Sequence, residues 1–188
     1  MSKNLLELPA DLPVPEDDGA ARHLPGSVVP DVALPSTAGG PVVLAALSGR
    51  SVVYAFPRTG VPGEKPLDEN WEMIPGARGC TPESCAFRDH HAELLEAGAR
   101  VFGMSTQDTA FQRAAVERLH LPFHLLSDCR LELARALDLP LMTVSDVVLM
   151  KRFTLILRDG RIEHVFYPVF PPDRHAAEVL DWLRVHPA

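Results

Sequence analysis

Two β-rich runs separated by one helical segment constrain the fold of this chain more than any other feature. The runs are SVVYAF at 51–56 and ARVFGMST at 99–106, and each has the composition of a buried strand. Between them, apolar residues recur at helical spacing from Thr81 onward, until Gly98 closes the segment. Because a strand, a helix and a strand within about 55 residues form a right-handed crossover, the two runs are predicted to pair in parallel.

Individual residues predict where this helix starts and which face it buries. Thr81 is expected to be its N-cap, with Pro82 in the first helical position and Glu83 in the first turn. Cys80 therefore lies beside the N-terminus of a helix. Four side chains at helical spacing are expected to share one face: Phe87, His91, Leu94 and Leu95.

Other patterns along the chain complete an α/β architecture. Short extended segments flank a turn at Gly39-Gly40, and Asp159-Gly160 joins two alternating runs within 152–168. Asp-Gly between two such runs is the strongest short hairpin signal. The remaining segments are expected to form a strand at 122–128 and helices at 108–120, 130–139 and 173–185. The sequence thus predicts a central mixed sheet flanked by helices on both faces.

The chain divides into a tail and one domain, as its length of 188 residues suggests. Residues 1–24 are rich in proline, leucine and acidic residues without a clear period, so we expect an N-terminal extension followed by a domain over residues 25–188. A second unpatterned stretch, 57–79, contains four prolines and four glycines. Loops longer than about 15 residues are uncommon unless they serve a function, so this loop is expected to serve one.

Charge and hydropathy argue against several classes of function. The net charge is −7 and basic residues form no run, so binding of nucleic-acid phosphates is not expected. No stretch approaches the roughly 18 apolar residues of a membrane span. The N-terminal residues lack the apolar stretch and cleavage site of a secretory signal, so we expect a cytoplasmic protein.

Two of the three cysteines, Cys80 and Cys85, lie five positions apart at the start of the predicted helix. Three cysteines are too few for a disulfide-stapled secreted scaffold, and close cysteines in a reducing compartment more often serve catalysis, redox exchange or metal binding. Backbone N–H groups and the helix dipole favour an anion at a helix N-terminus. The sequence therefore places Cys80 where a reactive thiolate would be built.

A disulfide between these two cysteines requires the helix to open. Five residues of an α-helix rise about 7.5 Å and turn about 140° away, whereas bonded cysteines have Cα atoms about 4.4–6.8 Å apart. If Cys80 and Cys85 are to bond, the first turn must unwind, and Pro82 makes that turn easier to release because it lacks an N–H. The spacing predicts local unfolding as part of a redox cycle.

The residues alone leave other interpretations of the two cysteines. One is that Cys80 and Cys85 are small apolar fillers, since buried cysteine is common. A structural zinc site is less favoured because no second cysteine pair follows, although the chain has eight histidines.

The stretch GCTPESCAFRDHHAELLEAGARVFGMST at 79–106 resembles the active-site region of peroxiredoxins, and most closely that of the Q type, also called bacterioferritin comigratory protein. In that type one cysteine lies in GCT and a second follows five residues later, before F-R-D. Four more stretches fit the family: PDVALPSTAGGPVVLAAL, VVYAFP, LLSD and RFTLILRDGRI. The resemblance covers about residues 26–186.

The resemblance implies a thioredoxin-like fold and a thiol peroxidase that reduces hydrogen peroxide or organic hydroperoxides without a cofactor or metal. Cys80 would be the peroxidatic cysteine, which is oxidised to a sulfenic acid, and Cys85 the resolving cysteine, which condenses with it to a disulfide. Arg152 fits the arginine that steadies the thiolate and polarises the peroxide, and Pro57 fits the proline that shields the cysteine. A thioredoxin- or glutaredoxin-type protein would reduce the disulfide, in a monomer or a homodimer. Cys129 is interpreted as a part-buried structural thiol or as an alternative resolving cysteine.

The chain departs from the family pattern just before Cys80. Ala77 stands where the family has threonine or serine, so one hydroxyl is missing. Between Pro57 and Cys80 lie 22 residues where the pattern has six, an insertion of 16 with the sequence TGVPGEKPLDENWEMI. Thr59 within the insertion is a candidate replacement for the hydroxyl. Trp71 is expected to anchor this loop, or else to pack over the pocket or contact a partner.

Two other classes of function are compatible with the cysteines. A general thiol-disulfide oxidoreductase on a related fold usually has C-x-x-C, which this chain lacks. A thioredoxin-like copper-binding module resembles C-x3-C with a distant histidine, whereas four residues separate Cys80 and Cys85. Arg152 and Pro57 also have purely structural interpretations, as a solvated strand-end charge and as a strand terminator.

Overall fold

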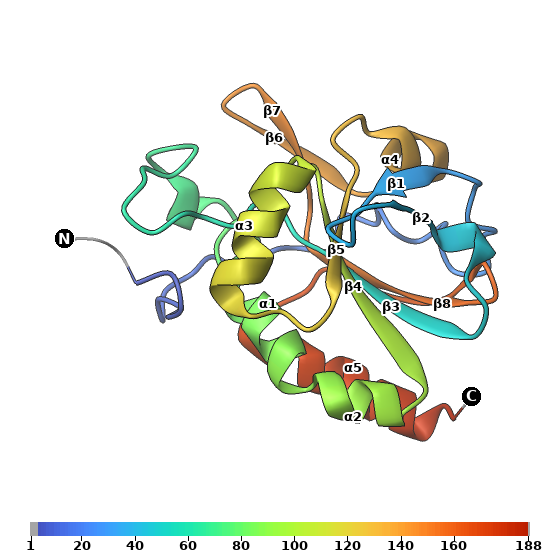
Figure 1. The fold of residues 1–188 in the computed structure, drawn as a ribbon. Helices are drawn as coiled ribbons and strands as arrows, with labels where there is room; N and C mark the ends of the chain where they lie inside the picture. Colours follow the sequence, from blue (N-terminus) through green and yellow to red (C-terminus); the bar gives the residue numbers. More distant parts are fainter. Residues whose placement is uncertain (1–3, 188) are drawn as a thin grey trace.

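The computed structural model describes residues 4–187 and has a five-stranded mixed sheet at its centre (Figure 1). The strands are β3 Arg50–Ala55, β4 Ala99–Ser105, β5 His124–Ser127, β8 Phe153–Arg158 and β9 Arg161–Phe166. Their order is β5-β4-β3-β8-β9; β3, β4 and β5 are parallel, while β8 and β9 are antiparallel to their neighbours. The two β-rich runs thus pair in parallel as predicted, with Val52 opposite Val101.

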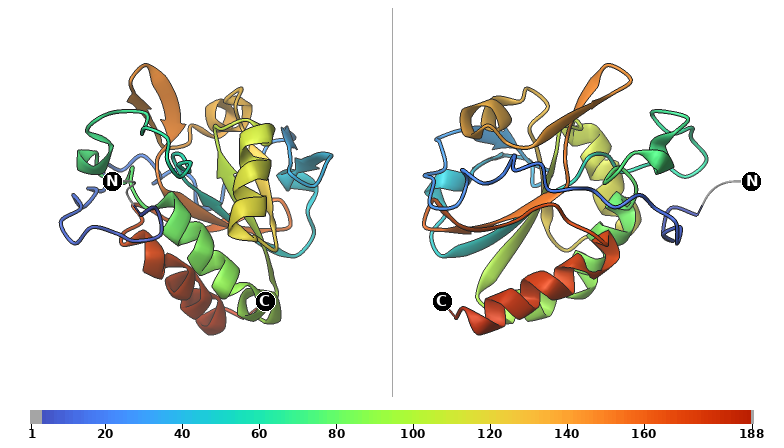
Figure 2. Two further views of the ribbon diagram at one scale, coloured as in Figure 1. Left: turned by 60° about the vertical axis from the view of Figure 1, so that its left-hand side comes forward. Right: turned by 180° about the vertical axis from the view of Figure 1, so that it is seen from behind.

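Helices cover both faces of the sheet, which confirms the predicted α/β class (Figures 1 and 2). They are α1 Cys80–Asp89, α2 His91–Glu96, α3 Thr109–Leu119, α4 Glu132–Leu137 and α5 His175–Val185. One core cluster, which includes Tyr54 and Phe87, packs α1, α2, α3 and α5 against the sheet. The other includes Val53 and Leu24 and packs α4 and the N-terminal segment. Tyr54 and Val53 are neighbours on β3, so they point to opposite faces.

Helix α1 differs from its prediction at both ends. It begins at Cys80, because Gly79 adopts a left-handed φ of 110° as the N-cap residue, and Thr81 is not the cap. Pro82 is therefore the third helical residue, where its missing N–H costs nothing because the first N–H groups have no partner within the helix. The helix ends at Asp89 and α2 begins at His91, yet Phe87 and Leu94 are both fully buried in one core cluster, as predicted. Leu95, predicted to face the core, is 48% exposed.

Hairpins connect several of the shorter strands. The predicted pair beside Gly39-Gly40 is β1 Ala33–Pro35 with β2 Pro41–Val43. Asp159-Gly160 joins β8 to β9 with φ values of 49° and 72°, the sign that a type I′ turn requires. A hairpin that the sequence did not predict, β6 Leu141–Val144 with β7 Val147–Met150, turns at Ser145-Asp146 with φ values of 47° and 64°. That turn contains no glycine, so its signal was missing.

The N-terminal segment packs on the domain. Leu24 is completely buried in the core. The carboxylate of Asp18 accepts hydrogen bonds from Lys151 Nζ at 2.5 Å and from the Tyr167 hydroxyl at 2.7 Å. These bonds to Lys151 and Tyr167 hold the pKa of Asp18 well below its ordinary value. Figure 2 shows the segment, in blue, running across the back of the molecule toward the N-terminus.

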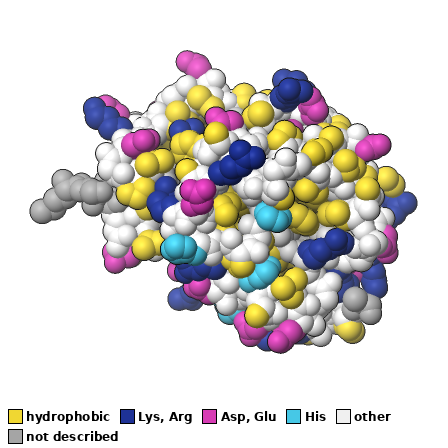
Figure 3. Space-filling view, viewed as in Figure 1, with side chains coloured by type: hydrophobic (Ala, Val, Ile, Leu, Met, Phe, Trp, Pro, Cys, Tyr) yellow, Lys and Arg dark blue, Asp and Glu magenta, His cyan; other side chains and the backbone are white. Residues whose placement is uncertain are grey.

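Basic and acidic side chains are interspersed on the face seen in Figure 3 rather than gathered into regions of one sign. Hydrophobic side chains occur among them across the same face. Within residues 4–187, no helix combines the length and the apolar character needed to cross a membrane.

Candidate active site

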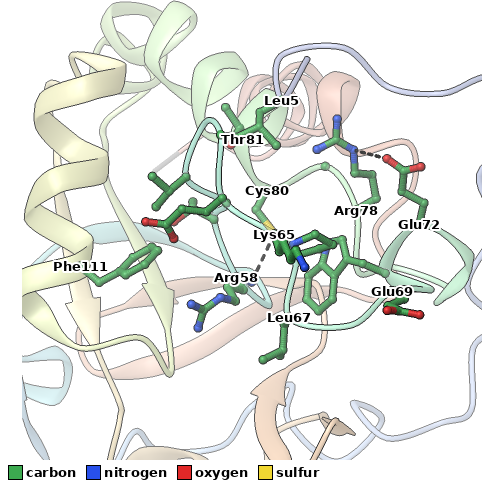
Figure 4. Close-up of a pocket in the computed structure, with 18 residues that line it drawn as sticks. Leu5, Arg58, Lys65, Leu67, Glu69, Glu72, Arg78, Cys80, Thr81 and Phe111 are labelled. Carbon is green, nitrogen blue, oxygen red and sulfur yellow. Dashed lines mark hydrogen bonds and ion pairs between the residues drawn. The ribbon is translucent and has the colours of Figure 1, made fainter. Parts of the chain in front are cut away.

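Cys80 is the first residue of α1, and it lines a pocket (Figure 4). The residue is only 2% exposed. The backbone N–H of Arg58 donates to Cys80 Sγ at 3.4 Å, and Nη2 of Arg152 donates to it at 3.2 Å. The same sulfur lies 3.6 Å from the carbonyl oxygen of Ala77. Two donors, one of them a cation, suit a sulfur that carries negative charge.

Arg152 lies directly before β8 and contacts two residues of α1, Cys80 and Glu83. Its Nη1 donates to Oε2 of Glu83, and its Nη2 also donates to the carbonyl oxygens of Gly76 and Arg78, both at 3.2 Å. Burial alone would lower the pKa of Arg152, but the neighbouring Glu83 and Cys80 raise that pKa above its ordinary value. The guanidinium is thus held as a cation next to the sulfur. Its side chain is only 1% exposed, so Arg152 is not a solvated charge at a strand end.

Glu83 is a site residue that the sequence predicted only as an acid in the first turn of the helix. It is completely buried, and burial raises the pKa of its carboxyl while the Arg152 cation opposes that rise. Residues three apart lie on one face of a helix, so Glu83 and Cys80 both face Arg152. The spacing of three residues between Cys80 and Glu83 in the sequence would have predicted that Glu83 belongs to the site.

Pro57 and Thr59 shape the loop that leaves β3. Pro57 is buried and directly precedes Arg58, whose N–H points to the Cys80 sulfur. The N–H and hydroxyl of Thr59 both donate to Oε1 of Gln107, at 2.9 and 3.1 Å. The Thr59 hydroxyl is therefore directed to Gln107 and not to the sulfur, although Thr59 lines the same pocket. A role for this hydroxyl toward a peroxide stays a prediction.

The insertion at 59–74 forms much of the wall of the pocket beside Cys80. The pocket has a volume of about 470 Å³. Apolar side chains from three separate parts of the chain line it: Leu5, Val61, Leu67, Trp71 and Phe111. The Arg58 guanidinium lies over the Phe111 ring, 5.0 Å from its centroid, and Figure 4 labels both among the residues that line the pocket. Trp71 thus belongs to the pocket wall, in a short 3-10 helix at Trp71–Met73.

The other two cysteines differ from Cys80 in exposure. Cys85 is half-buried on α1, and Cys129 is exposed, contrary to the expectation of a part-buried thiol. All three are free thiols, and α1 is intact over both Cys80 and Cys85. In the described part of the chain, no three His, Cys, Asp or Glu side chains gather in a way that could hold a metal ion.

In the reduced protein at pH 7, iodoacetamide should modify Cys85 more slowly than Cys129. Burial raises the pKa of the Cys85 thiol above its ordinary value of 9.0, and the thiolate is the form that reacts. Because this pKa is raised, labelling of Cys85 should increase as the pH rises above 9.0 toward the raised pKa. Peptide mass mapping over time measures both rates, and unfolding in urea should make them converge. Equal rates in the native protein at pH 7 would contradict the protection of Cys85 by α1.

A buried cysteine lies at a helix N-terminus and faces an arginine, in an α/β fold with a mixed sheet. This combination defines a thiol-dependent redox enzyme. Comparison with known proteins identifies the family. A redoxin domain matches residues 24–180. Chloroplastic peroxiredoxin Q of Gentiana triflora is 31% identical over an alignment that covers 97% of this chain and 79% of that protein.

Two solved structures agree with this match. The crystal structure of peroxidoxin BcpB from Mycobacterium tuberculosis has a TM-score of 0.69 at 27% identity, covering 88% of this chain and 100% of that one. Bacterioferritin comigratory protein of Xanthomonas campestris has a TM-score of 0.65 at 25% identity, covering 95% of this chain and 99% of that one. The chain therefore belongs to the peroxiredoxin family, in its Q type, and is a thiol-dependent peroxidase. The predicted family and thioredoxin-like fold are confirmed.

Proposed function

We propose that Cys80 is the peroxidatic cysteine. Its thiolate sulfur bonds to the terminal oxygen of a hydroperoxide ROOH, the O–O bond breaks, and ROH leaves after gaining a proton. The sulfur loses two electrons and becomes a sulfenic acid, and the peroxide gains the same two. The observation that carries the proposal is the convergence of Arg152 Nη2 and the Arg58 N–H on the Cys80 sulfur beside a pocket.

Arg152 stabilises the thiolate and, in the transition state, the negative charge that develops on the departing oxygen. Pro57 excludes water from the side of the sulfur where the Arg58 N–H lies. Glu83 is a positioning residue, because it acts on the cysteine through Arg152. The burial of Arg152 and Glu83, with side chains 1% and 0% exposed, supports these assignments, since a buried ion pair holds one geometry.

Cys85 is the resolving cysteine. Its sulfur attacks the Cys80 sulfenic acid, a disulfide forms, and the displaced oxygen leaves as water after gaining a proton. Both cysteines lie on intact α1, so its first turn unwinds before the bond forms. A thioredoxin- or glutaredoxin-type dithiol then restores both thiols and is itself oxidised to a disulfide. These steps use one chain, so they proceed equally in a monomer or a homodimer.

The substrates include organic hydroperoxides as well as hydrogen peroxide. The Xanthomonas campestris relative has alkyl peroxide reduction activity. The apolar wall and the volume of about 470 Å³ support the same class of substrate here, because pockets of this kind bind the body of a small organic molecule.

Turnover coupled to thioredoxin, thioredoxin reductase and NADPH tests this cycle, with glutaredoxin and glutathione as a second arm. We expect peroxide-dependent NADPH oxidation by the wild-type protein and by Cys129→Ser. Cys85→Ser should lose this turnover because its sulfenic acid has no partner in the chain, yet it should still consume one equivalent of peroxide. Turnover that survives in Cys85→Ser, or is lost in Cys129→Ser, would contradict the assignment of Cys85.

A further inference from the structure

Residues 4–16, here called the strap, lie along the loop that leads into α1. A methyl group placed on Gly79 would lie 3.1 Å from Cδ2 of Leu8, and one on Gly76 would lie 3.8 Å from Cβ of Pro15. The strap therefore lies beside both ends of the 76–79 segment that enters the helix, and Pro172 lies closer still to Gly79. Figure 2 shows this part of the chain, in blue, leading to the N-terminus on the side where α1 begins.

Arg78 ties the strap to the reacting cysteine. Its Nη2 donates to the backbone carbonyl oxygens of Asn4 at 2.7 Å and Glu7 at 3.0 Å. The carbonyl oxygen of Arg78 itself accepts from Arg152 Nη2, the atom that also donates to Cys80 Sγ. Hydrogen bonds thus join the strap carbonyls to Arg78, Arg78 to Arg152, and Arg152 to the Cys80 sulfur. The Arg78 side chain is 10% exposed, whereas its two acceptors belong to exposed residues of the strap, so both bonds lie at the surface.

The strap also contributes to the wall of the pocket. Leu5 lines its wall, and a methyl group placed on Gly60 would lie 3.3 Å from Cδ2 of Leu5. The strap therefore contacts the insertion as well as the start of α1. Arg78 contributes to the same junction, since its Nε lies 3.8 Å from Oε1 of Glu72 in the insertion.

We propose that the strap, held by Arg78, keeps the first turn of α1 folded and so slows the formation of the Cys80–Cys85 disulfide. The inference rests on the proposed cycle, in which that turn unwinds. Unwinding moves Gly79 and Cys80 away from their present neighbours, and it therefore breaks the contact with Leu8 and pulls on Arg78. Arg78 is a positioning residue, because it acts through the backbone and through Arg152.

A slower resolving step changes the fate of the sulfenic acid. While the turn stays folded, a second hydroperoxide can oxidise Cys80–SOH to the sulfinic acid, releasing one more ROH. The strap thereby sets how the intermediate divides between the disulfide, which a dithiol can reduce, and the sulfinic acid, which it cannot. Release of the strap shifts this division toward the disulfide.

The test compares wild type with Arg78→Ala and Arg78→Lys, and uses Arg130→Ala as a matched surface control, since the Arg130 side chain is 82% exposed and lies 3.7 Å from Glu132. Quenched samples taken after one equivalent of hydrogen peroxide give the rate of disulfide formation by mass, and samples at excess peroxide give the sulfinic fraction. We expect Arg78→Ala to form the disulfide about tenfold faster, because two hydrogen bonds to the strap are lost. Its sulfinic fraction should fall, Arg78→Lys should be intermediate, and Arg130→Ala should match wild type.

A second variant, Leu8→Ala, removes the strap's share of the packing beside Gly79, leaves Pro172 and Arg78 in place, and should shift both readouts in the same direction. Circular dichroism of each reduced variant establishes that it is folded before the rates are compared. Disulfide formation in Leu8→Ala and Arg78→Ala that is no faster than in wild type, with an unchanged sulfinic fraction, would overturn the role of the strap. Absence of the disulfide in wild type would instead overturn the proposed cycle.

Discussion

Replacing Arg152 by methionine should lower the second-order rate constant for oxidation of Cys80 by hydrogen peroxide about 100- to 1,000-fold, the cost of removing one preorganised donor from a site of developing charge. Arg152 is the only side chain in the described residues that donates to this sulfur. Methionine keeps most of the volume of the side chain but removes both the charge and the donors. Competition with a peroxidase of known rate, followed by stopped-flow absorbance, measures the rate constant.

The same substitution leaves the Glu83 carboxylate buried without its partner, which costs about 3–5 kcal/mol of folding stability. The double variant Arg152→Met with Glu83→Gln removes that unpaired charge, so it separates loss of chemistry from loss of stability. It should recover stability in urea unfolding while the rate constant stays low. A double variant that oxidises as fast as wild type would show that Arg152 serves only the fold.

Cys80→Ser should abolish peroxidase turnover, with a loss of at least about 1,000-fold, because a serine hydroxyl is a weak nucleophile that does not accept an oxygen from a peroxide. The sulfur of Cys80 is the atom on which the Arg58 and Arg152 donors converge. NADPH-coupled turnover measures the effect, and Cys129→Ser is the matched control because Cys129 is exposed and away from the pocket lining. Residual turnover of Cys80→Ser near the wild-type rate would move the peroxidatic role to another thiol.

The parts of the fold that the sequence predicted are those with a local pattern. The parallel pair at 51–56 and 99–106 and the Asp159-Gly160 hairpin follow from neighbouring residues, and both are present. The break at His90 and the hairpin that turns at Ser145-Asp146 were missed. Neither contains the proline or glycine that would have marked it, so tertiary packing and not local preference decides both.

The residues of the candidate site also fall into those that a local pattern predicted and those that it did not. Cys80, Cys85 and Arg152 were predicted from the cysteine spacing and the family resemblance. The Arg58 N–H, the Gln107 amide and the strap were not predicted, because each is far in sequence from the residue it contacts. Arg58 is 22 residues from Cys80, Gln107 is 48 residues from Thr59, and Asn4 is 74 residues from Arg78. Such contacts leave no periodicity or motif in one sequence. The insertion was recognised by its length alone, and its role as a pocket wall required the folded structure.

The most direct test of the peroxidase cycle is the intact mass and thiol count of the reduced protein after one equivalent of hydrogen peroxide. We predict a loss of about 2 Da and of two thiols, with a disulfide that peptide mapping assigns to Cys80 and Cys85 and that is absent from Cys80→Ser. A gain of about 16 or 32 Da without thiol pairing would show that Cys80 reacts but Cys85 does not resolve it. No change within minutes would contradict direct reduction of peroxide by this chain.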